Sequence, residues 1–231
     1  MIQIVTTLLA AFLAVSPKIL IPAPAEIISG QETCVLPEKL SYNIVCKADT
    51  AGLASLERYI GASGLASGSL TGGDINIVLG DRKLAKRFSS EKDFVREAAY
   101  CLEVTPKGIE IKAITPKGAF YAIQSLRQML YRGRELETCI VTDWPVMRYR
   151  GLMLDISRNF RDKEFIEKQI DAMALLKMDK LHLHLTDDAG WRIQIDSKPR
   201  LTDVAAWRVG ETWSQWVDFG KQYSQKDSPR A

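Results

Sequence analysis

A strand–helix–strand pattern in the last third of the chain places the strongest constraint on its fold. Residues 150–156 (RGLMLDI) are mostly apolar, which is typical of a strand buried on both faces. Asp162 can cap a helix that runs to about Met178, with apolar residues at three- and four-residue steps. Residues 180–186 (KLHLHLT) then read as a second strand. This order predicts a βαβ unit with two parallel strands.

The preceding part of the chain alternates shorter elements and predicts a separate α+β domain with a small antiparallel or mixed sheet. The segment Asp143-Trp144-Pro145 marks the change between the two patterns. We therefore expect an α+β domain over residues 21–143 and an α/β segment over 144–231. The expected strands cover residues 42–48, 75–79, 100–104 and 109–113, the last two as a hairpin, and the expected helices cover 53–60 and 117–130.

The first residues of the chain predict export. Ile2 to Val15 are mostly apolar, about the length of a signal-peptide core and too short to span a bilayer. We therefore expect a signal peptide over residues 1–20 and a periplasmic, secreted or surface location. No other segment approaches membrane-spanning length, so no membrane span is predicted.

The net charge and the cysteine spacing argue against nucleic acid binding and against a zinc site built from cysteines. The formal net charge of +3 is too small and too scattered to favour nucleic acid binding. The four cysteines show no zinc-ligand spacing, which leaves disulfide pairing or simple burial as interpretations. An exported chain would permit a disulfide. Nothing in the sequence indicates a cofactor. The cysteines are Cys34, Cys46, Cys101 and Cys139.

Polar side chains gather where the two predicted parallel strands end, which is where barrels and open α/β sheets build their sites. Carboxylates and an arginine can hydrogen-bond hydroxyl groups, and a tryptophan can stack on an apolar sugar face, so the set suits a polar, neutral, ring-shaped ligand. An alternative is a metal-dependent barrel hydrolase that uses His182 and His184. The candidate residues are Asp155, Arg158, His184, Asp187, Asp188 and Trp191.

Three stretches of this sequence resemble glycoside hydrolase family 20, the β-N-acetylhexosaminidases. Residues 150–160 (RGLMLDISRNF) and 170–178 (IDAMALLKM) are followed by the most specific stretch, 181–192 (LHLHLTDDAGWR). Residues 118–126 (GAFYAIQSL) also resemble the helix of the small domain that precedes the family's barrel. Two departures are Asn159, where the family usually has histidine, and Asp179, where it usually has asparagine. The resemblance implies a small α+β domain followed by the first two to three βα units of a TIM (β/α)8 barrel.

Position by position, the resemblance also implies roles in a sugar site. Arg158 matches the arginine that binds hydroxyls of the terminal sugar. Asp187, with His184 beneath it, matches the polar support of that subsite, Asp188 is assigned to substrate binding beside it, and Asp155 orients Arg158. Trp191 matches a family position that either contacts sugar or packs under the barrel rim. The implied ligands are glycans that end in N-acetylglucosamine or N-acetylgalactosamine, and no metal or cofactor is implied.

The implied reaction is substrate-assisted retaining hydrolysis, in which the acetamido oxygen of the substrate attacks its anomeric carbon. In the family, an adjacent Asp-Glu pair orients the acetamide and acts as general acid and base. This sequence contains no Asp-Glu pair, so no catalytic residue is assigned. A TIM barrel needs about 250 residues, whereas 231 − 143 = 88 residues follow the boundary. We therefore expect a fragment that is inactive alone, with a non-catalytic carbohydrate-binding remnant as the alternative.

Overall fold

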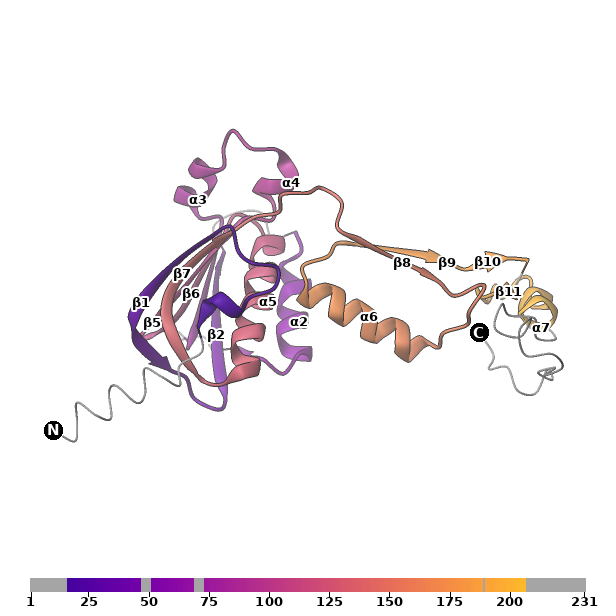
Figure 1. Ribbon diagram of the computed structural model, residues 1–231, viewed down its shortest axis with the longest axis horizontal. Coiled ribbons are helices and arrows are strands. Elements are labelled where there is room, and N and C mark those ends of the chain that lie inside the picture. The colour runs from indigo at the N-terminus through magenta and orange to yellow at the C-terminus, as the bar shows by residue number, and fades with distance from the viewer. Residues whose placement is uncertain (1–15, 47–50, 69–72, 189, 207–231) are drawn as a thin grey trace. The chain divides into compact units, whose positions relative to one another are not determined.

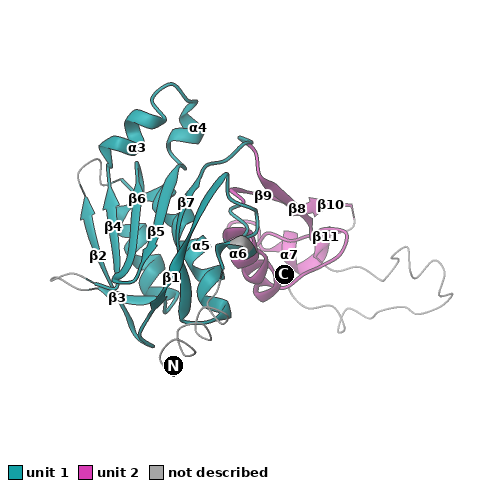
Figure 2. Ribbon diagram, turned by 60° about the vertical axis from the view of Figure 1, so that its left-hand side comes forward, with its two compact units in different colours: residues 1–148, 175–177 teal, residues 149–174, 178–231 magenta. Residues whose placement is uncertain are grey.

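The computed structural model describes residues 16–46, 51–68, 73–188 and 190–206. The chain divides into two compact units, the first comprising residues 1–148 with 175–177 and the second residues 149–174 with 178–231 (Figure 2). The predicted signal peptide core at residues 2–15 lies outside the described residues, as does the tail from residue 207 onward, which holds Trp207, Trp213 and Trp216.

A seven-stranded mixed sheet forms the centre of the first unit (Figure 1). Its strand order is β1-β7-β5-β6-β4-β2-β3. The pairs β1/β7, β7/β5 and β5/β6 are antiparallel, whereas β6/β4, β4/β2 and β2/β3 are parallel. The predicted mixed sheet and its hairpin at residues 100–113 are thus confirmed. The strands are β1 (Glu26–Val35), β2 (Leu40–Cys46), β3 (Ala66–Gly68), β4 (Ile75–Leu79), β5 (Tyr100–Thr105), β6 (Gly108–Ala113) and β7 (Glu135–Asp143).

Two helices, α2 (Leu53–Ala62) and α5 (Pro116–Arg132), cover one face of this sheet (Figure 1). Strands β4, β5 and β6 alternate buried and half-buried residues, so one face of each lies in the core under the helices. Helix α5 begins after Thr115, whose hydroxyl accepts a hydrogen bond from the Lys117 N–H at 3.2 Å. The predicted helix over residues 117–130 is confirmed. The first unit also contains the short helices η1 (Pro17–Ile19), α3 (Arg82–Arg87) and α4 (Asp93–Arg96).

One glycine lets α5 approach the strands closely. A Cβ atom on Gly118 would lie 2.4 Å from the Ala99 carbonyl oxygen and 3.3 Å from the Ala113 Cβ. Neither contact involves a flexible side chain, so any larger residue would force the helix away from the sheet. The sequence therefore needs glycine here for packing, although glycine weakens a helix interior.

A buried polar cluster lies at one edge of the core. The Lys177 ammonium lies 2.7 Å from Asp143 Oδ2 and donates to the Tyr100 hydroxyl at 2.8 Å. The Tyr100 hydroxyl also lies 2.7 Å from Ser125 Oγ. Burial, followed by the nearby Asp143 charge, raises the pKa of Tyr100 well above its usual value. The phenol therefore stays neutral, and the charges in this cluster are those of the lysine and the aspartate.

The second unit begins with the predicted βαβ unit. Strands β8 (Gly151–Asp155) and β9 (Lys180–His184) are parallel, and α6 (Lys163–Leu175) connects them. Asp162 caps the helix, since its carboxylate accepts a hydrogen bond from the Phe165 N–H at 2.7 Å. The unit continues with the short strands β10 (Thr186–Asp187) and β11 (Gly190–Trp191), which are antiparallel, and the helix α7 (Arg200–Ala205).

Two details of the sequence prediction for this unit are wrong. The helix ends at Leu175 rather than near Met178, because Lys177 takes a left-handed conformation (φ 58°) and the Met178 N–H bonds back to the Met173 carbonyl. Strand β8 is not buried on both faces, since the Met153 side chain is 57% exposed. Within the described residues β8 pairs with β9 alone, and a two-stranded sheet cannot enclose both faces.

The four cysteines form no disulfide in the described chain, and burial accounts for Cys34 and Cys139. Burial, followed by the charge of Glu137, raises the pKa of the Cys139 thiol to about 12.

Across the residues that the structure describes, no helix combines the length and apolar character needed to cross a membrane.

Candidate sugar-binding site

Arg158 lies at the centre of a polar cluster where β8 and β9 end. Its Nε and Nη2 atoms both lie 3.1 Å from Asp187 Oδ2, and its Nη1 lies 3.4 Å from Asp155 Oδ2. Asp155 also accepts a hydrogen bond from the Arg158 N–H at 3.0 Å. Because β8 and β9 are parallel neighbours, their carboxyl ends bring side chains 29 residues apart into contact.

His184 lies between the same two carboxylates. Its Nδ1 is 3.3 Å from Asp155 Oδ2, and its Nε2 is 3.5 Å from Asp187 Oδ2. The Nε2 atom also lies 3.1 Å from the Thr186 carbonyl oxygen. The Arg158 side chain is 66% exposed, whereas those of His184, Asp187 and Asp155 are 21–30% exposed. The Arg158 guanidinium is therefore exposed to solvent, and the polar side chains that contact it are half-buried.

Both carboxylates stay ionised at neutral pH. The N–H of Arg158, followed by the His184 and Arg158 charges, lowers the pKa of Asp155. The N–H of Asp188, followed by the side chain of Arg158, lowers the pKa of Asp187. Each carboxylate can thus act as an acceptor for hydroxyl donors, while the guanidinium donates. Paired donors and acceptors of this kind suit sugar hydroxyl groups, which both donate and accept.

The remaining predicted site residues are placed less centrally. The N–H of Asp188 donates to Asp187 Oδ1 at 2.8 Å, so this residue supports the cluster through its backbone. The indole N–H of Trp191 donates to the Ile193 carbonyl at 2.5 Å, and the residue is half-buried. His182 is exposed on β9, two residues before His184. Within the described ranges, no group of three or more His, Cys, Asp or Glu residues could hold a metal ion.

Two further residues, Ser157 and Arg192, contact the backbone next to this cluster and were not predicted from the sequence. Ser157 is fully buried and its hydroxyl donates to the Gly190 carbonyl at 2.7 Å. Arg192 donates from Nε to the Ile156 carbonyl at 3.0 Å and from Nη2 to the Ser157 carbonyl at 3.1 Å. The signal available in the sequence was the position of Arg192 directly after Trp191, in the stretch that resembles the family motif.

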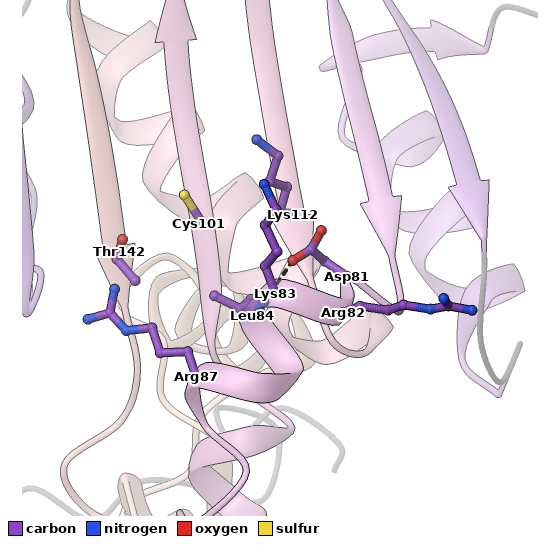
Figure 3. Close-up of a pocket in the computed structure, with 9 residues that line it drawn as sticks. Asp81, Arg82, Lys83, Leu84, Arg87, Cys101, Lys112 and Thr142 are labelled. Atoms are coloured by element: carbon purple, nitrogen blue, oxygen red, sulfur yellow. Dashed lines mark hydrogen bonds between the residues drawn. The ribbon is translucent and has the colours of Figure 1, made fainter.

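A cavity of about 730 Å³ lies in the first unit, where α3 meets the sheet face opposite α5 (Figure 3). Several cations line it, including Lys112 and Arg87, yet each of these two has an acidic partner. Lys112 Nζ lies 2.5 Å from Glu110 and 3.2 Å from Glu103, and Arg87 lies 2.5 Å from Glu26. These ion pairs offset the positive charge of Lys112 and Arg87, and we assign no ligand to the cavity.

Comparisons with known proteins identify the class of this chain as glycosyl hydrolase. The model of glycosyl hydrolase family 20, domain 2, matches residues 18–144, and that of the family's catalytic domain matches residues 147–230. A β-hexosaminidase of Vibrio vulnificus is 40% identical over 139 residues, covering 60% of this chain and 15% of the relative. The N,N'-diacetylchitobiase of Vibrio harveyi is 43% identical over 122 residues, covering 52% of this chain and 14% of the relative.

Solved structures of the same family have a similar fold. A GH20 exo β-N-acetylglucosaminidase of Vibrio harveyi, in complex with N-acetylglucosamine, has a TM-score of 0.67 at 29% identity and covers 84% of this chain and 29% of that protein. The β-N-acetylhexosaminidase of Bacteroides fragilis has a TM-score of 0.67 at 28% identity and covers 86% of this chain and 38% of that protein.

The chain therefore belongs to glycosyl hydrolase family 20. Its fold is the family's small α+β domain followed by the beginning of a TIM barrel. The chain aligns with only about one seventh of the length of the two Vibrio relatives named above.

Proposed function

We propose that this chain carries part of the terminal-sugar subsite of a β-N-acetylhexosaminidase. The enzyme it represents would remove non-reducing terminal N-acetylglucosamine or N-acetylgalactosamine from glycans. The observation that carries this proposal is the position of Arg158 between Asp155 and Asp187, at the carboxyl ends of two parallel strands in the segment that matches the family's catalytic domain.

The geometry supports recognition of two vicinal sugar hydroxyls. Asp187 and Asp155 hold the guanidinium from one side, and its exposed side faces solvent, where a sugar could bind. A planar guanidinium can donate to two neighbouring hydroxyls at once, which a lysine ammonium does less well. Asp187 can accept from one of these hydroxyls because its lowered pKa keeps it ionised. In this proposal His184 and Asp188 keep Asp187 in place, and Trp191 borders the sugar.

Hydrolysis requires groups that this chain does not contain. In the substrate-assisted route, the acetamido oxygen attacks the anomeric carbon, the leaving oxygen takes a proton, and water later opens the oxazolinium intermediate. The proton transfers need a positioned general acid and base, and this sequence has no Asp-Glu pair to supply them. We therefore expect the 231-residue chain to bind N-acetylhexosamines without hydrolysing them.

The test is a titration of the isotope-labelled 231-residue chain with N-acetylglucosamine, followed by the backbone amide signals of Asp155, His184, Asp187 and Asp188, which the parent and the variants share. We expect these signals to shift in a saturable way. The affinity for N-acetylglucosamine should be at least about tenfold lower in Arg158→Lys, because charged hydrogen bonds are lost. Arg161→Lys is the matched control, since Arg161 lies over the Phe165 ring, 5.3 Å from its centre, rather than in the cluster.

Three other outcomes would redirect the proposal. Equal affinity in Arg158→Lys and the parent would show that any bound sugar lies elsewhere, as in a carbohydrate-binding remnant built on the small domain. Stoichiometric zinc bound through His182 and His184 would favour the metal-dependent alternative. Saturable binding of glucose with the same affinity would show that this cluster recognises ring hydroxyls alone and does not select the acetamido group.

We also propose that the chain is exported, with residues 1–20 as the signal peptide. The support is the apolar run from Ile2 to Val15, which has the length and composition of a signal-peptide core. Fusion of residues 1–20 to a reporter that is active only after export tests this. A reporter that stays inside the cell would contradict it.

A further inference from the structure

The Arg192 side chain folds back against the backbone that precedes Arg158. Its guanidinium donates to three carbonyl groups, at 3.0 Å to Ile156, 3.1 Å to Ser157 and 2.6 Å to Ala206. Two of these carbonyls belong to the residues that separate Asp155 from Arg158. Arg192 is therefore bound to the turn that carries the sugar-site arginine.

Further hydrogen bonds connect the same turn to β9 and β11. The N–H groups of Ile156 and Ser157 both donate to the His184 carbonyl at 3.1 Å. The Ser157 hydroxyl donates to the Gly190 carbonyl at 2.7 Å, and Ser157 is fully buried. These bonds satisfy the N–H groups of the turn, while Arg192 satisfies its carbonyls. The turn at residues 156–157 is therefore hydrogen-bonded through both its N–H groups and its carbonyls.

Gly190 lies directly against the folded Arg192 side chain. A Cβ atom on Gly190 would lie 2.6 Å from Arg192 Nη2 and 2.7 Å from Cζ, so a side chain there would collide with the guanidinium. Gly190 itself is buried. The glycine thus leaves the space into which Arg192 folds.

The location of Arg158 depends on this backbone. Its side chain is 66% exposed, so surrounding side chains do not enclose it. Its contacts to Asp187 at 3.1 Å and to Asp155 at 3.4 Å require its Cα to lie where the turn places it. An error of about 1 Å in such a position can lower function about 100-fold.

We propose that Arg192 is a positioning residue, which clamps the carbonyls of Ile156 and Ser157 and thereby places Arg158 on Asp187 and Asp155. Its importance for sugar binding rests on the proposed function of that cluster, but its effect on Arg158 does not. The hydrogen bonds of Arg192 named above all go to backbone carbonyls. In this proposal Arg192 therefore acts on the position of Arg158 and not on the sugar directly.

The test measures the Nε–H signal of Arg158 in the unliganded 231-residue chain, by chemical shift and solvent exchange. In the parent chain we expect a protected signal, because Arg158 Nε donates to Asp187. Arg192→Ala and Gly190→Ala should both raise its exchange rate at least about tenfold, because small displacements of a positioned group act strongly on contacts of this kind. Arg161→Lys, a nearby exposed arginine outside the turn, should leave the signal unchanged.

Addition of N-ethylguanidinium should restore the protected Arg158 signal in Arg192→Ala, because it supplies the lost donors. A parent-like signal in Arg192→Ala would overturn the proposal. So would loss of the whole fold of residues 149–206 in Arg192→Ala without recovery on N-ethylguanidinium, because Arg192 would then support the fold as a whole. If the parent fails to bind N-acetylglucosamine while the Arg158 signal responds as expected, the proposed function fails and the positioning role stands.

Discussion

Replacement of Lys177 by methionine tests whether the buried ion pair stabilises the first unit. The Lys177 ammonium lies 2.7 Å from Asp143 Oδ2 and 2.8 Å from the Tyr100 hydroxyl. The two charged side chains are only 9% and 13% exposed. Methionine keeps most of the length and apolar volume of the side chain, so the substitution removes the charge and its donors with little change in packing.

The expected loss follows from the charge that remains. Removal of one partner from a buried ion pair costs about 3–5 kcal/mol, because the other charge stays buried. Asp143 keeps two donors, the Tyr100 hydroxyl at 3.1 Å and the Ala25 N–H at 3.2 Å. We therefore expect the lower end, about 3 kcal/mol of unfolding free energy. The double variant Lys177→Met/Asp143→Asn should lose about 2 kcal/mol less than the sum of the single variants.

Hydrogen exchange of the β5 and β7 amides in the full chain measures this free energy, because those strands open only when the first unit unfolds. Lys117→Met is the matched control. Lys117 lies 3.5 Å from Glu97 with 39% of its side chain exposed, and a surface pair of this kind contributes about 0–1 kcal/mol. Equal losses in the two variants, or additive losses in the double variant, would refute the reasoning.

Three further expectations concern the first unit. Gly118→Ala should destabilise it by about 1–3 kcal/mol in urea unfolding, despite the better helix propensity of alanine, because the new Cβ would lie 2.4 Å from the Ala99 carbonyl oxygen; an increase in stability would contradict the close packing. The hydroxyl and N–H of Ser41 lower the pKa of Asp74, so the stability that Asp74 contributes is present above its unfolded-state pKa of about 4 and is lost as the pH falls through the folded-state value. Asp74→Asn should therefore flatten the acid limb of a curve of stability against pH. An unchanged acid limb would contradict this contribution of Asp74. Burial raises the pKa of the Cys139 thiol from 9.0 to about 12. The stability that the buried neutral thiol contributes is therefore present below pH 9 and is lost as the pH rises toward 12. Rapid alkylation of Cys139 in the native chain at about pH 8 would contradict its burial.

The sequence predicted elements whose pattern is local. The hairpin over residues 100–113, the helix over 117–130 and the parallel pair around residues 150–186 each have an apolar period and turn residues of their own, and all three are present. Strands β1 and β7 were not predicted. They pair with each other across 100 residues or more, and the register of β1 shifts between Ser29 and Thr33, which breaks its alternation.

The end of α6 shows how distant contacts override local pattern. The apolar period continues to Met178, but Lys177 adopts a left-handed conformation in which its ammonium reaches Asp143 and Tyr100. Its partners lie 34 and 77 residues earlier in the chain, so no window of sequence around the helix contains this information.

The candidate site divides in the same way. Asp155, Arg158, His184 and Asp187 follow predicted parallel strands, so their proximity could be inferred from the rule that such strand ends meet. The role of Arg192 could not, because it depends on which carbonyls its side chain reaches after the chain reverses from β10 to β11.

The most direct test of the sugar subsite is the activity of a chimera. Residues 147–206 of this chain would replace the matching segment of the N,N'-diacetylchitobiase of Vibrio harveyi, a relative 43% identical over 122 residues. We predict that the folded chimera hydrolyses p-nitrophenyl N-acetyl-β-glucosaminide, and that Arg158→Lys lowers kcat/KM at least about tenfold whereas Arg161→Lys does not. A folded chimera without activity, or one indifferent to Arg158→Lys, would contradict the assignment of this cluster to the terminal sugar.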